Sequence, residues 1–90
     1  MSTNLFKVID ICQSNHIETS FVRALQQNGL LELIVIESQE FVHEDHLPQL
    51  QRFSSWYYDL EINIQGIEVV EDLVRRIEQL QREVKRLKQV

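Results

Sequence analysis

The last third of the sequence, residues 64–90, most constrains the fold, because its apolar side chains repeat every seven positions. β-Branched residues occupy one position of the repeat and leucines occupy a second, and mostly charged or amide side chains lie between them. This combination is typical of two helices that pack knobs into holes. The sequence therefore predicts one long helix over about 64–88 and a second copy as its partner. The predicted dimer residues are Val70, Leu73, Ile77, Leu80, Val84 and Leu87.

An amphipathic helix that folds back on its own domain would show a similar pattern. Three heptads of apolar residues favour the homodimer. The flanking charges permit both helix orientations. In a parallel pair Glu83 would face Lys88 of the partner subunit, whereas in an antiparallel pair Arg76 would face the partner's Glu83. Leu80 would lie near the two-fold axis of the antiparallel pair.

The preceding residues, 1–62, are expected to form a small head that belongs to the same structural domain as the long helix of 63–90. Helical spacing of apolar residues predicts helices over about 7–14 and 18–28, with Cys12 in the core. Gly29 follows the second helix in the position of a left-handed C-cap. These features predict a helix-turn-helix.

Two short β-branched and aromatic runs, 30–36 and 41–42, predict a two-stranded hairpin after Gly29. A third helix is then expected from about Pro48, which fits a first helical turn, with Asp45 as a possible cap. Its inward face is predicted from the spacing of Leu47, Leu50, Phe53, Tyr57 and Leu60. The fold class is therefore mainly α: a winged helix-turn-helix head with a small β-hairpin wing and a long C-terminal dimerisation helix. Asn63 is expected to cap that last helix, with Ile62 stapled to Ile67.

The net charge of -5 divides unevenly along the chain. Residues 1–74 hold three cations and twelve anions, a sum of -9, whereas 75–90 hold six cations and two anions, a sum of +4. An acidic head repels a phosphate backbone. The basic end could be taken for a nucleic-acid site, but cations near a helix C-terminus also favour the helix dipole and commonly flank coiled-coil seams.

Several classes of protein are not expected from this sequence. It contains no apolar run of membrane-spanning length and no secretory signal, and one cysteine cannot form an internal disulfide, so we expect a cytoplasmic protein. No nucleotide-binding loop or nucleophile motif indicates an enzyme, a cofactor or a small-molecule substrate. His43 and His46 have two-histidine metal spacing, but no further ligand completes a set, and we expect no metal.

The order of elements resembles the MerR superfamily, in which the second helix carries an Arg six residues before a Gly-Leu pair; here these are Arg23, Gly29 and Leu30. The segment DLEINIQGIEVV at 59–70, preceded by LPQLQRF at 47–53, resembles CbpM-type chaperone modulators. That resemblance implies a protein that binds the J-domain of a DnaJ- or CbpA-like co-chaperone and inhibits its stimulation of Hsp70 (DnaK). The MerR resemblance implies an antiparallel dimer.

The sequence departs from DNA-binding MerR proteins at two places. Ala24 and Leu25 stand where two aromatics typically follow the Arg, and the 40–42 segment, Glu-Phe-Val, replaces a phosphate-contacting Arg-x-Tyr element. Phosphate contacts set the register of a protein on a duplex. We therefore do not expect a nucleic-acid partner, although a MerR-like DNA-binding transcription regulator remains the alternative.

Acidic side chains around the expected hairpin could instead receive the basic helix that a J-domain presents. The alternative is a solvated surface. Trp56 or Tyr58 is expected to point outward from the third helix and could anchor an interface, although aromatic residues at helical spacing are more often core. The predicted partner-binding residues are Glu32, Glu37, Glu40, Glu44, Asp45, Trp56 and Tyr58.

Overall fold

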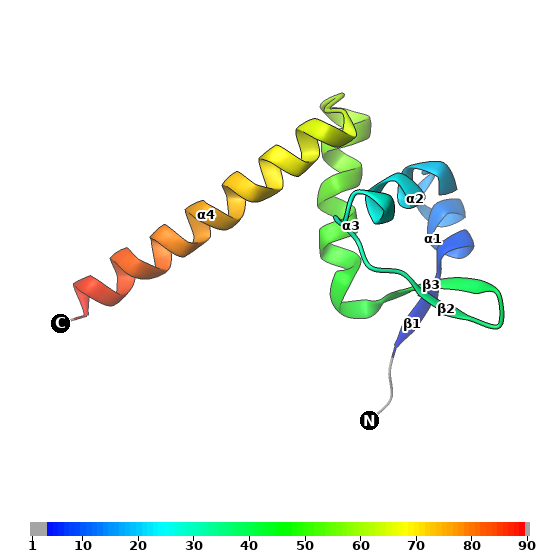
Figure 1. The fold of residues 1–90 in the computed structure, drawn as a ribbon, viewed down its shortest axis with the longest axis horizontal. Coiled ribbons are helices and arrows are strands. Elements are labelled where there is room, and N and C mark those ends of the chain that lie inside the picture. Colours follow the sequence, from blue (N-terminus) through cyan, green and yellow to red (C-terminus); the bar gives the residue numbers. More distant parts are fainter. Residues whose placement is uncertain (1–3, 90) are drawn as a thin grey trace.

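A computed structural model describes residues 4–89 as a small head from which one long helix projects (Figure 1). The elements of the head, in chain order, are β1 (Leu5–Lys7), α1 (Val8–Asn15), α2 (Thr19–Gln27), β2 (Ile34–Ile36), β3 (Gln39–His43) and α3 (Leu47–Ser54). The long helix α4 (Ile64–Lys88) follows a corner beside the end of α3 and carries the C-terminus away from the head. The mainly helical head with a small sheet agrees with the predicted class.

Helices α1 and α2 form the predicted pair and supply nearly half of the buried core residues. Val8 and Cys12 of α1 and Phe21, Val22 and Leu25 of α2 are buried. At the end of α2 the N–H groups of Gly29 and Leu30 donate to the carbonyls of Gln26 and Leu25, at 3.1 and 2.9 Å. This pattern requires a left-handed residue, and Gly29 has φ of +72°. The predicted glycine cap is therefore confirmed.

The sheet contains the predicted hairpin together with a strand that the prediction missed. β2 and β3 are antiparallel and joined by Glu37 and Ser38, both with positive φ, as in a type I′ turn. β1 pairs antiparallel with the other side of β3, so the strand order is β1-β3-β2. The first strand of the hairpin, β2, is shorter than the predicted run 30–36. Leu30 and Leu31 are buried in the core before this strand begins.

The entry to α3 corrects the expected cap. A 3-10 turn, Glu44–His46, precedes the helix, and Nδ1 of His43 accepts the N–H of Asp45 at 3.0 Å. Asp45 lies inside this turn with its side chain largely exposed, so it does not cap α3. His43 caps the turn because it is the last residue with an extended backbone. Pro48 lies in the first turn of α3, as predicted.

The end of α3 departs from regular helical spacing. Ser55–Asp59 form a π-helical turn, in which the N–H of Leu60 donates to the carbonyl of Ser55 at 3.2 Å. A π turn holds more residues than an α turn and rotates the side chains that follow it. Tyr57 and Leu60, predicted to face inward, are consequently 37% and 62% exposed, whereas Trp56 packs against the core.

The start of α4 is fixed by its cap and by a close backbone approach. Asn63 is the predicted N-cap, since its Oδ1 accepts the N–H of Gly66 at 2.8 Å. Ile62 lies against Gly66, where a Cβ would stand 2.7 Å from Ile62 Cγ2. Only the first turns of α4 pack on the head: Ile67 and Glu71 are buried, while Leu73 is half-exposed.

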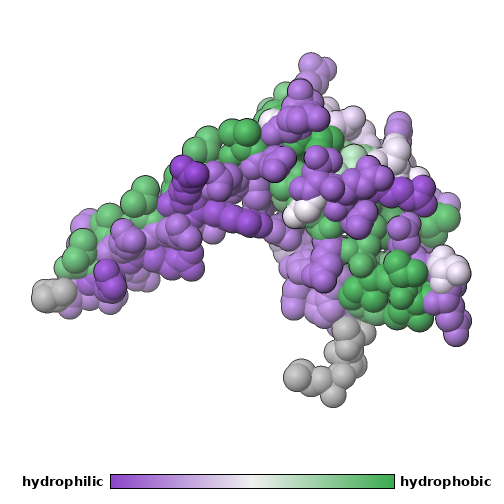
Figure 2. Space-filling view, viewed as in Figure 1, coloured by the Kyte–Doolittle hydropathy of each residue, from purple (hydrophilic) through white to green (hydrophobic). Residues whose placement is uncertain are grey.

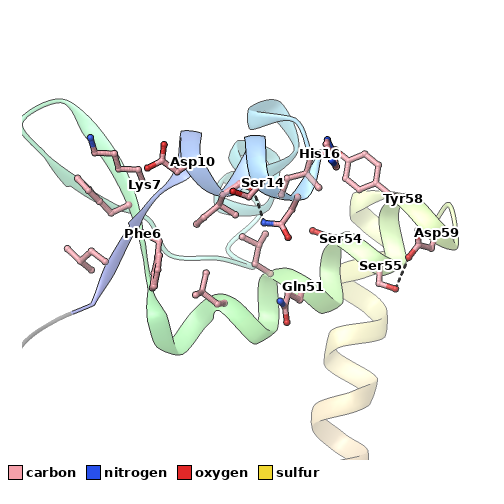
Figure 3. A pocket seen from close by; sticks show the side chains of 17 residues that line it. Phe6, Lys7, Asp10, Ser14, His16, Gln51, Ser54, Ser55, Tyr58 and Asp59 are labelled. Carbon is pink, nitrogen blue, oxygen red and sulfur yellow. Dashed lines mark hydrogen bonds between the residues drawn. The ribbon is translucent and has the colours of Figure 1, made fainter.

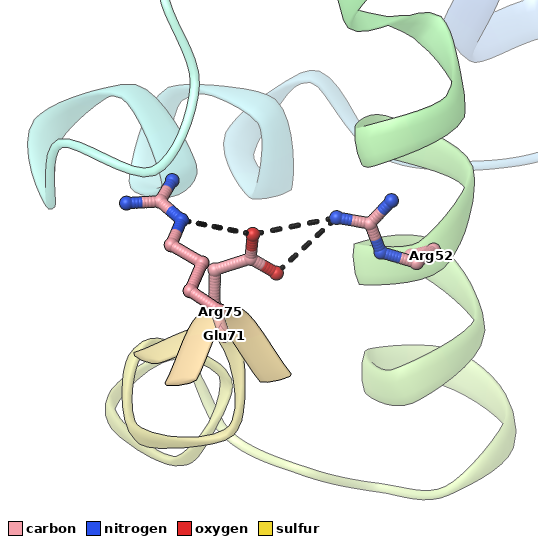
Figure 4. A network of polar contacts seen from close by, with 3 residues as sticks. All are labelled: Arg52, Glu71 and Arg75. Carbon is pink, nitrogen blue, oxygen red and sulfur yellow. Dashed lines mark hydrogen bonds and ion pairs between the residues drawn. The ribbon is translucent and has the colours of Figure 1, made fainter. Parts of the chain in front are cut away.

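A buried carboxylate joins α4 to α3 (Figure 4). Both carboxylate oxygens of Glu71 lie 3.3 Å from Nη2 of Arg52 on α3, and one lies 3.4 Å from Nε of Arg75 on the next turn of α4. Glu71 is 4% exposed, whereas both arginines reach solvent. A buried charge is retained at low cost only when it is paired. This contact, absent from the sequence prediction, fixes the direction of α4 relative to α3.

Replacing Glu71 with Gln should lower the free energy of unfolding by about 1–2 kcal/mol, because a neutral amide loses the charge-assisted contacts while the arginines can still turn to water. Urea unfolding at one protein concentration measures the change. Asp72→Asn is the matched control: the exposed Asp72 pairs with Arg76 at 3.0 Å, and its loss should cost less than about 0.5 kcal/mol. Equal effects of the two variants would contradict the role given to Glu71.

Candidate functional site

A groove of about 860 Å³ runs along α3, opposite β1 and α1 (Figure 3). We call it the α3 groove. Gln51, Ser54, Ser55 and Asp59 come from α3 and its π turn. Phe6, Lys7, Asp10 and Ser14 come from β1 and α1 across from them. The apolar lining is contributed by Leu5, Phe6, Ile11, Ile17, Phe41, Leu47 and Leu50. The hollow is therefore apolar within and polar along both sides.

Tyr58 lies at one end of the α3 groove, where the start of α2 holds it in place (Figure 3). The Tyr58 hydroxyl accepts the N–H of Glu18 at 3.0 Å, and its ring meets the ring of Phe21 edge-on at 5.3 Å. Beside it, Asp59 accepts a hydrogen bond from Ser55 Oγ at 3.2 Å. A carboxylate at this end and Asp10 on α1 give the groove an acidic border.

The predicted acidic residues fall into two groups. Glu32 precedes the hairpin, Glu37 lies in its turn and Glu40 lies on its second strand. Glu40 is 3.4 Å from Nη2 of Arg23 on α2. Glu44 and Asp45 lie at the entry to α3, where Glu44 accepts from Asn4 Nδ2 at 2.7 Å. These two residues precede Leu47, which lines the α3 groove. The hairpin group is separate from it.

The predicted aromatic anchors lie at the far end of α3 from Glu44 and Asp45. Trp56 is partly buried, with its ring centroid 5.8 Å from that of Phe53. Tyr58 is 39% exposed and lines the α3 groove. The structure therefore does not place an aromatic anchor directly beside the predicted acidic residues. Tyr58 lies near one end of the groove, and the α3 entry lies near the other end.

Two exposed apolar surfaces remain (Figure 2). A hydrophobic stripe follows α4, and five of the six predicted dimer residues lie half-exposed or more: Leu73, Ile77, Leu80, Val84 and Leu87. The sixth, Val70, is partly buried. The second surface lies on the hairpin and β1, where Val35 is 65%, Ile36 46% and Phe6 43% exposed.

The histidine pair of the α3 entry is not arranged as a metal site. The rings of His43 and His46 are 6.1 Å apart, and His43 Nδ1 is already engaged by the N–H of Asp45. Within residues 4–89, no group of three or more His, Cys, Asp or Glu side chains is placed to hold a metal ion. Across the same residues, no helix is long and apolar enough to span a membrane.

The sequence prediction missed Asp10, Gln51, Ser54 and Asp59 as lining residues of the groove. Each is a polar residue on a helical or π-helical segment, which by itself indicates only a solvated face. Recognising the strand Leu5–Lys7 would have helped, because this strand leads directly into α1 and pairs with β3, which leads to α3. Asp10 on α1 could then have been placed opposite Gln51, Ser54 and Asp59. That strand is too short to predict from its own residues.

Comparison with known proteins gave two matches. The family model described as "MerR HTH family regulatory protein" matches residues 6–89. "Chaperone modulatory protein CbpM" of Pseudomonas putida (strain W619) is 27% identical over 93 residues, which cover 99% of this chain and 92% of that protein. No solved structure matches the chain.

Cys12 should react slowly with iodoacetamide at pH 8, because burial raises the pKa of its thiol and keeps it protonated. Urea-unfolded protein should react at the rate of a free thiol. The raised pKa also predicts that its contribution to stability is constant at lower pH and declines as pH rises above about 8.5, where the unfolded thiol ionises. A Cys12→Ala variant should lack this decline, and rapid labelling of the native protein would contradict the buried placement.

Proposed function

The chain belongs to the MerR helix-turn-helix family of regulatory proteins, and on that basis we propose that it is a chaperone modulator. It binds the J-domain of a DnaJ- or CbpA-like co-chaperone and inhibits that protein's stimulation of Hsp70. The likeness to a chaperone modulatory protein over nearly the whole chain supports this choice within the family. So do the 59–70 and 47–53 segments that resemble CbpM-type modulators. The partner and the inhibition are the proposal.

The observation that carries the proposal is the acidic hairpin. Glu32, Glu37 and Glu40 occupy the element that contacts phosphates in the DNA-binding members. Of the two cations beside this element, Arg23 is engaged by Glu40 at 3.4 Å, and Lys7 lies opposite Phe41 on the neighbouring strand β1. Exposed Val35 and Ile36 lie between these carboxylates. Apolar side chains surrounded by acidic ones suit a basic protein surface. The same surface repels a nucleic acid.

We also propose a homodimer formed through α4 by an antiparallel pair of helices. The exposed stripe from Leu73 to Leu87 supports it, because that much contiguous apolar surface is uncommon on a monomer of this size. In this antiparallel pair Arg76 faces the partner's Glu83, so opposite charges meet across the seam. We further propose that the protein acts in the cytoplasm, together with its co-chaperone partner.

A DNA-binding transcription regulator is the second candidate, favoured by the family match and by the α1–α2 pair. It predicts salt-dependent retardation of duplex DNA, since neutralised phosphates release counterions. Retardation that Arg23→Ala abolishes would favour this candidate over the chaperone modulator. Retardation by Arg23→Ala at wild-type strength would indicate non-specific attraction to the basic end of α4.

Binding to the J-domain of the co-chaperone from the same genome should be measurable by titration calorimetry and should weaken as salt rises, because salt screens the carboxylates. Glu37→Lys and Glu44→Lys should each raise the Kd by about threefold to tenfold. Glu78→Lys on α4 is the matched control and should leave the Kd unchanged, because Glu78 is exposed and lies outside the α4 seam. The protein should also lower co-chaperone-stimulated Hsp70 ATP hydrolysis. No binding at tens of micromolar would refute the proposal.

Leu80→Arg should convert the protein from a dimer to a monomer near 10.7 kDa by light scattering, because it buries charge at the centre of the seam. Gln79→Arg is the control, since position 79 faces away from the seam of the heptad. A Leu80→Arg variant that remains dimeric would remove the α4 seam from the proposal.

A further inference from the structure

We infer that the α3 groove is a docking site for a basic amphipathic helix of the partner protein. The inference deepens the proposed function, which rests on the hairpin, by assigning a second surface of the head to the same partner. It relies on the proposed function for the identity of the partner as a J-domain protein. The groove itself can be tested without that identity.

The first argument is shape. α3 with its π turn runs from Leu47 to Asp59, roughly 20 Å at helical rise, and therefore offers a wall as long as three to four turns of a docked helix. Apolar residues from β1, α1, β3 and α3 line the interior along that wall. A helix that binds in a groove inserts apolar side chains spaced at i, i+3 or i+4, and i+7. The interior of this groove is suited to such a row.

The second argument is charge. Asp10 stands on the α1 side, Asp59 on the α3 side, and Glu44 and Asp45 lie at the α3 entry just before Leu47. Among the described residues that line the groove, Lys7 is the only Lys or Arg. A helix with Lys or Arg beside its apolar row would meet one lining carboxylate on each side, Asp10 and Asp59. These two carboxylates outnumber Lys7, so the groove disfavours an acidic helix or a nucleic acid.

The third argument is hydrogen bonding at the border. Gln51, Ser54 and Ser14 supply neutral donors and acceptors between the carboxylates, and Tyr58 is oriented by its bond to the Glu18 amide. Tyr58 can therefore present a fixed aromatic surface at the end of the groove with little loss of side-chain entropy. Apolar interior, polar border and an oriented aromatic make up the usual anatomy of a protein interface.

Gln51→Trp fills the groove and should raise the Kd for the J-domain by about tenfold or more. Gln26→Trp is the matched control, an exposed glutamine on α2 outside the groove, and its Kd should stay within about twofold of wild type. Asp10→Lys, with Glu68→Lys on α4 as its control, tests the charge argument in the same way. Circular dichroism of each variant verifies that the head remains folded.

A second arm uses a synthetic helix with Leu at i, i+3, i+4 and i+7 and Lys elsewhere, and a version with Glu in place of Lys. The Lys peptide should bind wild type and Gln26→Trp but not Gln51→Trp, and the Glu peptide should bind none of them. J-domain binding that both Trp variants retain would overturn the groove and leave the hairpin as the docking surface. Peptide binding without J-domain binding would support the groove and refute the proposed function. Failure of both ligands would overturn both.

Discussion

The direction of α4 depends on one buried carboxylate. Glu71 is held by Arg52 from α3 and by Arg75 from its own helix, and beyond it the apolar residues of α4 are exposed. Together with Ile67 and the Asn63 cap, this contact orients a 25-residue rod by its first two turns. Apolar burial alone would leave the helix free to roll, since a methyl group has no preferred direction of contact, whereas a carboxylate between two guanidinium groups does. Whatever α4 pairs with is therefore presented at a defined angle to the head.

The head combines the fold of a regulatory family with an acidic hairpin. The family match covers the α1–α2 pair and the hairpin, but the hairpin bears carboxylates and exposed aliphatic side chains. The α3 groove also combines apolar lining residues with two carboxylates. A fold constrains function less than the residues on its surface do. The two surfaces are linked through β3, which belongs to the hairpin and pairs with β1 of the groove wall.

The sequence predicted the regular elements and failed where the backbone departs from regular spacing. Periodicity placed α4, and capping chemistry placed Asn63 and Gly29, because each of these signals is local. It could not place β1, whose three residues acquire strand geometry only by pairing with a distant strand. The π turn at Ser55–Asp59 has no local signature either, and a strict helical count therefore assigned Tyr57 and Leu60 to the core. The α3 groove could not be predicted either, because one of its walls is formed by β1 and α1, and β1 was not predicted.

The strand order β1-β3-β2 has a consequence for how the head assembles. β3 meets β2 across a two-residue turn, a contact that forms within microseconds, but it meets β1 only after the chain has closed a loop that contains α1, α2 and β2. Closure of that loop costs entropy before any pairing repays it. β1 and β2 are both edge strands of three residues, but only β2 is joined to β3 by a two-residue turn. β1 should therefore open before β2 in the native state and should show early amide exchange. One wall of the α3 groove is thus expected to open more readily than the wall formed by α3, whose Leu50 and Phe53 are buried.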